Sequence, residues 1–142
     1  MVTDLNEEEY VKLLDRAFSK IPDVSAAKSD FIIPKVESIA EGSKTMVRNI
    51  SSIADAGRRK VSEIARYISK ELGVPVGADE KRLVINGRFT SDDLNKRVAR
   101  YFELYVVCKE CKKPDTHLES AGGGMFYLVC EACGSRYAVK SY

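Results

Sequence analysis

The stretch Cys108-Lys109-Glu110-Cys111, followed after residues 112–129 by Cys130-Glu131-Ala132-Cys133, decides the fold of the C-terminal part of the chain. A Cys-x-x-Cys turn points two thiolates to one side, and two such turns complete a tetrahedron around one zinc ion. Four thiolates leave no open position for water or substrate, so the pattern predicts one structural Zn²⁺ rather than a catalytic one. Two disulfides, or iron in the same cage, are the alternatives.

The residues around these cysteines predict a β zinc ribbon over residues 106–142. Short β-prone stretches lie at 116–119, 125–129 and 136–140, and Gly122-Gly123-Gly124 supplies a tight reversal. A unit of fewer than about 40 residues has too small a core to be stable alone, which makes the metal a requirement for folding. The single histidine, His117, is interpreted as a surface residue, because four cysteines already close the site.

Residues 35–105 predict an α+β core domain. Strands are expected at 44–50 and 82–85, with Asn86-Gly87 as a type I′ turn into a return strand at 88–90. One helix should end at Gly73, and another should be capped by Thr90 or Ser91. Apolar residues at helical spacing define their buried faces: Val61, Ile64, Ala65, Ile68 and Leu72 in the first, and Leu94, Val98, Tyr101, Phe102 and Tyr105 in the second.

The N-terminal residues 1–22 predict an isolated amphipathic helix, and residues 23–34 a linker. Asn6 with Glu9 resembles a capping box, and Pro22 should end the helix. One face of the helix is apolar and consists of Tyr10, Leu13, Leu14, Ala17 and Phe18. A lone helix of about 15 residues is marginal in water, so this face must pack on something. The residues alone leave open whether it packs on the core domain or in a groove of a partner.

The whole chain is therefore expected to be α+β, with an N-terminal isolated helix, a small α/β sandwich-like core domain and a C-terminal β zinc ribbon. Net charge is +2 overall, but residues 1–22 carry −2 and residues 35–104 carry +4. Two basic clusters are candidates for contact with RNA phosphates: Arg58, Arg59, Lys60 and Arg66 with Lys70, and Lys96, Arg97 and Arg100. A solvated helix face explains them equally well.

Signatures of catalysis and of membrane insertion are not found in the sequence. It contains no phosphate-binding glycine loop in a strand-to-helix context, and no catalytic triad can be built from one histidine and four ligating cysteines. No apolar run approaches the roughly 18 residues that span a bilayer, and the acidic start, residues 1–10, is unlike a signal peptide. These patterns predict a non-enzymatic, cytoplasmic protein.

Several short motifs occur in a fixed order along the chain: Tyr10-x-x-Leu13-Leu14-x-Arg16-Ala17, Ile33-Pro34, Glu41-Gly42-x-Lys44-Thr45, Glu71-Leu72-Gly73, Arg82-Leu83-Val84-x-Asn86-Gly87-Arg88-Phe89, Tyr105-Val106-x-Cys108-x-x-Cys111, Pro114-Asp115-Thr116 and Cys130-x-x-Cys133-Gly134. Each motif is weak alone, but the ordered set is specific. In this set the chain resembles the beta subunit of archaeal translation initiation factor 2 over nearly its whole length.

The resemblance implies a non-catalytic subunit of a heterotrimer. Its gamma subunit would be the GTPase that carries methionyl initiator tRNA to the small ribosomal subunit, and the alpha subunit would be reached through gamma. The resemblance also implies that the N-terminal helix docks on gamma, through Tyr10, Leu13, Leu14, Ala17 and Phe18. The core domain and ribbon would then be mobile about the linker, near the nucleotide site and the RNA.

Two other functions fit parts of the sequence. A GTPase-activating factor like the N-terminal part of eukaryotic initiation factor 5 shares the two-domain plan and would supply an arginine in trans, for which Arg16 is the candidate. A stand-alone RNA-binding zinc-ribbon protein would bind RNA without gamma, with a steep dependence on salt.

Overall fold

The computed structural model describes residues 6–21 and 31–142, and its contacts divide the chain into two units, residues 1–30 and 31–142. The predicted α+β class is confirmed: one helix in the first unit, and helices with two small sheets in the second. Pro22 and the linker residues 23–30 lie outside the described residues. In the described part of the chain, no helix combines the length and apolarity that crossing a membrane requires.

The first unit contains helix α1, Glu7–Lys20. The Asn6 side chain accepts a hydrogen bond from the Glu9 backbone N–H at 2.8 Å, as an N-cap should. Glu7, Glu8 and Glu9 occupy the first turn, where the positive end of the helix dipole favours acidic residues. The helix ends at Ile21, whose N–H bonds to the carbonyls of Ala17 and Phe18.

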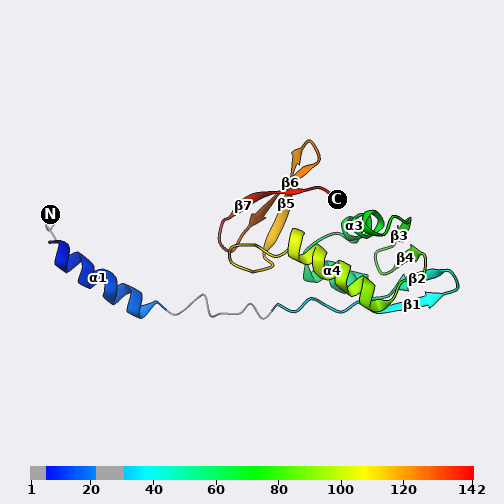
Figure 1. Ribbon diagram of the computed structural model, residues 1–142, viewed down its shortest axis with the longest axis horizontal. Coiled ribbons are helices and arrows are strands. Elements are labelled where there is room, and N and C mark those ends of the chain that lie inside the picture. Colours follow the sequence, from blue (N-terminus) through cyan, green and yellow to red (C-terminus); the bar gives the residue numbers. More distant parts are fainter. Residues whose placement is uncertain (1–5, 22–30) are drawn as a thin grey trace. The chain divides into compact units, whose positions relative to one another are not determined.

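The second unit begins with an antiparallel sheet in the order β1-β2-β4-β3 (Figure 1). Its strands are β1, Ser38–Glu41; β2, Lys44–Val47; β3, Val76–Ala78; and β4, Leu83–Asn86. Side chains alternate between the two faces of a strand, so Thr45 and Val47 share one face with Leu83 and Ile85, and all four are buried.

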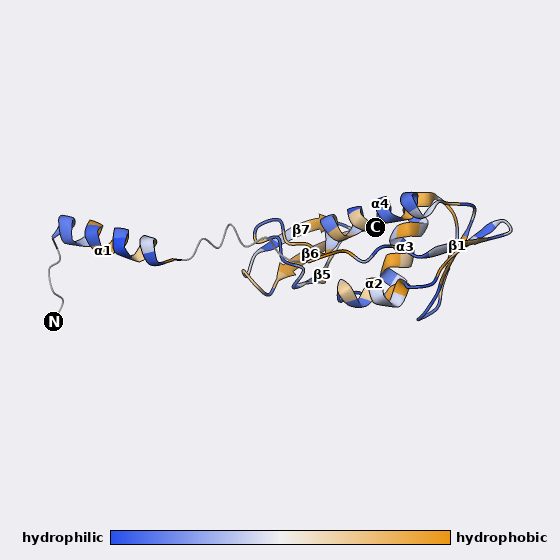
Figure 2. Cartoon of the chain, turned by 90° about the horizontal axis from the view of Figure 1, so that it is seen from below, coloured by the Kyte–Doolittle hydropathy of each residue, from blue (hydrophilic) through white to orange (hydrophobic). Residues whose placement is uncertain are grey.

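Three helices pack on the buried face of this sheet: α2, Ile50–Ala56; α3, Val61–Leu72; and α4, Ser91–Tyr105. The predicted face of α4 is buried in the core. On α3 the middle of the predicted face, Ile64, Ala65 and Ile68, is buried, while Val61 and Leu72 at its ends are partly buried. The apolar side of α3 is visible in Figure 2. The predicted ends are also present. Gly73 follows α3 with φ +66°, and the Thr90 hydroxyl accepts a hydrogen bond from the Asp93 N–H.

Two predicted strands of the core domain differ from the structure, one because it is shorter than expected and one because it is absent. The strand expected at 44–50 ends at Val47, because Ile50 starts α2. The return strand expected at 88–90 is not formed. β4 instead pairs with β2 and β3, and the buried Thr45 hydroxyl donates to the Gly87 carbonyl at 2.7 Å and accepts from the Phe89 N–H at 3.1 Å. The hairpin connections lie instead at residues 42–43, between β1 and β2, and at residues 79–82, between β3 and β4.

The three strands of the ribbon form a second antiparallel sheet in the order β5-β6-β7. They are β5, Thr116–Gly122; β6, Met125–Cys130; and β7, Arg136–Lys140. Each lies where the sequence predicts a strand. The reversal at 122–124 is made by three glycines with positive φ, which few other residues adopt.

Candidate metal centre and partner surfaces

The four cysteine sulfurs form one compact cluster. They lie within 4.8 Å of one another, with Cys108 Sγ 3.7 Å from Cys133 Sγ and Cys111 Sγ 3.5 Å from Cys130 Sγ. These separations are too long for disulfides, whose sulfurs lie about 2 Å apart. A zinc ion bound at about 2.3 Å to four sulfurs in a tetrahedron places them about 3.8 Å apart. The cluster therefore fits a tetrahedral ion held by four thiolates.

The two Cys-x-x-Cys turns have the same backbone geometry. The Cys108 N–H donates to the Lys113 carbonyl at 3.0 Å, and the Cys130 N–H donates to the Ser135 carbonyl at 2.9 Å. In each turn the residue after the second cysteine has positive φ: Lys112 at 59° and Gly134 at 75°. Matched turns present their thiols alike, which explains how residues 112–129 can separate the two halves of one site.

Ser135 adds a polar contact to the cluster. Its hydroxyl lies 3.1 Å from Cys133 Sγ and 3.0 Å from Cys108 Sγ. Hydrogen bonding from the Ser135 side chain and backbone lowers the pKa of the Cys133 thiol to about 6. A thiol with this pKa is largely ionised at neutral pH, and the thiolate is the form that binds metal.

His117 lies outside the cysteine cluster, on β5. Its Nε2 is 3.3 Å from Glu119 Oε1, and its Nδ1 is 3.3 Å from Glu131 Oε1. The imidazole is partly exposed among carboxylates, as expected for a surface residue.

The basic clusters separate into exposed and buried residues. Lys60, Arg66, Lys96 and Arg100 are exposed, as is Arg58, while Arg97 is partly buried and pairs with Glu71 at 3.5 Å. Arg59 is only 8% exposed, and its guanidinium bonds to backbone carbonyls, so its expected place in an RNA-facing cluster is wrong. Arg58 forms ion pairs with Asp115 at 3.4 Å and Glu131 at 3.6 Å.

The apolar face of α1 is exposed. None of the helix residues is buried, and the large side chains of the face remain accessible: Tyr10 55%, Leu13 49%, Leu14 37% and Phe18 69%. Apolar side chains of this size gathered on one helical face mark a contact surface.

Sequence patterns did not indicate the residues that join the core domain to the ribbon. They are Arg59, Tyr105, Thr116 and Tyr142, which bond or pack across the junction. Apart from one bond to the Thr116 hydroxyl, the hydrogen bonds end on backbone carbonyls, which carry no sequence signal. The sequence showed the buried position of Tyr105 on its helix and the basic character of Arg59, which was interpreted as a surface feature, but not the contacts between them.

Comparison with known proteins gives the family. The family model of a domain found in initiation factors 2B and 5 matches residues 22–136. The beta subunit of translation initiation factor 2 from Sulfurisphaera tokodaii is 39% identical, over 94% of this chain and 96% of the relative. The chain belongs to the beta-subunit family of translation initiation factor 2. This confirms the resemblance carried by the ordered motifs.

Other members of this beta-subunit family differ in length. The protein of the same name from Methanococcus vannielii is 36% identical, over 94% of this chain and 96% of the relative. The one from Picrophilus torridus is 33% identical over 94% of this chain, but the match spans only 64% of that relative. Each match covers nearly all of this chain, so the similarity extends beyond the ribbon to the core domain and the helix.

Proposed function

We propose that the protein is the non-catalytic beta subunit of heterotrimeric archaeal translation initiation factor 2. In this role it assists the GTP-dependent delivery of methionyl initiator tRNA to the small ribosomal subunit in the cytoplasm. The observation that carries the proposal is the 39% identity to a beta subunit over nearly the full length of both chains.

The N-terminal helix is proposed to bind the gamma subunit and, through it, to join the alpha subunit. Its exposed face of Tyr10, Leu13, Leu14, Ala17 and Phe18 supports this role. Burying each large apolar side chain contributes about 1.5–3 kcal/mol, enough in sum to offset the ordering of a marginal helix.

The ribbon is proposed to hold one structural Zn²⁺ through Cys108, Cys111, Cys130 and Cys133. The four-sulfur geometry supports this ion, and four protein ligands leave it no open position for chemistry. Contact with tRNA or ribosomal RNA is proposed for the exposed basic residues Arg58, Lys60, Arg66, Lys96 and Arg100, and for Arg97.

A binding measurement with purified gamma tests the proposal. The full chain should bind gamma, and a chain lacking residues 1–22 should lose most of that affinity. Replacing Leu13 by Asp should have a similar effect, while Lys12→Asp, a charge change on the opposite side of the helix, should have little. Equal binding by the full and shortened chains would overturn the docking proposal.

The same mixture tests the non-catalytic assignment. GTP turnover by gamma should not accelerate strongly when the protein is added. A large acceleration abolished by Arg16→Ala would instead identify an activating factor with an arginine supplied in trans.

A further inference from the structure

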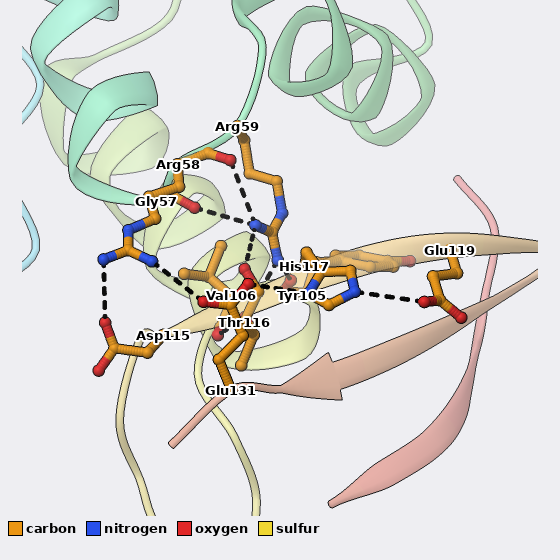
Figure 3. A network of polar contacts seen from close by, with 10 residues as sticks. All are labelled: Gly57, Arg58, Arg59, Tyr105, Val106, Asp115, Thr116, His117, Glu119 and Glu131. Carbon is orange, nitrogen blue, oxygen red and sulfur yellow. Dashed lines mark hydrogen bonds and ion pairs between the residues drawn. The ribbon is translucent and has the colours of Figure 1, made fainter. Parts of the chain in front are cut away.

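The side chain of Arg59 connects three elements of the second unit. Arg59 lies between α2 and α3, and its guanidinium donates to the Gly57 carbonyl at 3.1 Å and the Tyr105 carbonyl at 2.7 Å. It also donates to Thr116 at the start of β5, to the carbonyl at 2.7 Å and to Oγ1 at 3.0 Å. Figure 3 shows this side chain between the core helices and the ribbon strand.

The positions of these carbonyls explain why a buried cation is stable here. Gly57 is the C-cap of α2 and Tyr105 is the last residue of α4. Carbonyls at a helix C-terminus lack partners within the helix and carry the negative end of its dipole. Burial lowers the pKa of Arg59, but a guanidinium remains charged in proteins. One guanidinium thus donates hydrogen bonds to carbonyls at the ends of two helices and at the start of the first ribbon strand.

A second contact joins the core to the ribbon. The Tyr105 hydroxyl donates to the Lys140 carbonyl of β7 at 2.9 Å. The Tyr142 ring packs against Tyr105 of α4 at 5.3 Å and Phe126 of β6 at 5.6 Å between ring centroids. Exposed ion pairs of Arg58 with Asp115 and Glu131 also cross this junction. Contacts at several separate points resist rotation of the ribbon better than one contact alone.

We propose that Arg59 is a positioning residue that fixes the zinc ribbon on the core, so that residues 31–142 move as one rigid body. A partner of the second unit would then meet core and ribbon as a single surface. The proposal concerns this unit alone and does not depend on which partner binds.

Lysine cannot replace Arg59 in this role. A guanidinium presents several N–H donors in a fixed planar fork, while an ammonium is a compact point charge on a flexible stem. One ammonium cannot satisfy the separated carbonyls of Gly57, Tyr105 and Thr116 in the same geometry. The neighbouring Arg58 also reaches the ribbon, but through exposed ion pairs with Asp115 and Glu131, which contribute little. A lysine can form the same pairs, so Arg58→Lys is a matched control.

Residual dipolar couplings of the full, zinc-loaded chain in a weakly aligning medium test the proposal. Couplings from residues 35–105 and from residues 106–140 of the unaltered protein should fit a single alignment tensor. Arg59→Lys should require two tensors, whereas Arg58→Lys should keep one. A need for two tensors in the unaltered protein would overturn the proposal, as would one unchanged tensor in Arg59→Lys.

Zinc content and the dispersion of amide signals establish that each variant is folded. If Arg59→Lys does not fold, Thr116→Val is the second test, because it keeps the Thr116 carbonyl and removes the Oγ1 that bonds Arg59 and the Val106 carbonyl. The ribbon couplings should then shrink relative to those of the core. Unchanged couplings in Thr116→Val would overturn the claim that the bond from Arg59 to Oγ1 helps to hold the ribbon.

Discussion

Single residues determine whether the ribbon can hold its metal. Cys130 is 1% exposed, and its sulfur lies 3.5 Å from that of Cys111, so it belongs to the interior of the cluster. By contrast, His117 faces two glutamates rather than the cysteine sulfurs. The two residues lie in the same small sheet, which makes them a matched pair for testing the ligand set.

We expect Cys130→Ser to lose the bound zinc and to unfold the ribbon. Structural zinc contributes on the order of 10–16 kcal/mol to the folding of such units, and a serine hydroxyl is a poor substitute for a thiolate. Native mass spectrometry should show one zinc per unaltered chain and none in the variant. His117→Ala should keep the metal. Retention of zinc by Cys130→Ser, with an unchanged melting temperature, would contradict the assigned site.

At the scale of elements, Thr45 of β2 fixes the path of the chain between β4 and α4. It is fully buried, and its hydroxyl bonds both the carbonyl of Gly87 and the N–H of Phe89. These two bonds pair backbone groups of residues 87–89 that a neighbouring strand would otherwise pair. The chain can therefore leave the sheet after β4 and start α4.

We expect Thr45→Val to destabilise the chain by about 1–3 kcal/mol, because valine has the same shape but leaves a buried donor and a buried acceptor unpaired. Urea unfolding of the zinc-loaded chain measures this difference. Ser38→Ala, which removes an exposed hydroxyl contact with Ser91, should change stability by less than about 0.5 kcal/mol. Equal effects of the two substitutions would show that Thr45 has no special role.

The elements also show what the sequence could and could not predict. Helices α1, α3 and α4 and the three ribbon strands follow from apolar periodicity, caps and turn glycines, which are local signals. Strand β1, strand β3 and the short helix α2 were not predicted, because the two strands show no clear apolar alternation and α2 has no side-chain cap. The Asn86-Gly87 turn was predicted wrongly, since the long-range bonds of Thr45 override the local turn preference.

The candidate site also has a part that the sequence predicts, the cysteines, and a part that it does not, the contacts of Arg59. The cysteine cluster was predictable because a metal site imposes fixed residue types and spacing, and the four sulfurs lie together as predicted. Arg59 was assigned to the surface although it is buried. Its partners are the carbonyls of Gly57, Tyr105 and Thr116, which only the tertiary fold brings together.

At the scale of the whole molecule, a tyrosine cluster should make stability depend on pH. Burial raises the pKa values of Tyr67, Tyr101 and Tyr105, and burial with the nearby Glu63 raises that of Tyr142 to about 12. A tyrosine whose pKa is higher in the folded than in the unfolded state stabilises the fold in its neutral form. That contribution is complete below about pH 10 and is lost as the pH rises towards the folded-state value.

We therefore expect the urea midpoint of the full chain to fall between about pH 9 and about pH 11. Tyr142→Phe keeps the ring but removes one titrating hydroxyl, so its midpoint should fall less over the same interval. The exposed Tyr10 on α1 provides the control, and Tyr10→Phe should leave the pH dependence unchanged. If the urea midpoint of Tyr142→Phe equals that of the unaltered protein at every pH, Tyr142 is not a source of the pH dependence.

The bonds of Arg59 also bear on how the sequence can diverge. Its guanidinium contacts the main chain at Gly57 and Tyr105, and only at Thr116 does it use a side chain as well. Backbone carbonyls are present whatever the side chain, so mutations in the residues that supply them can be neutral for these bonds, while mutation of the arginine cannot. We expect an alignment of beta subunits to show strict retention of arginine at position 59, beside free drift at Arg58 and its exposed partner Glu131.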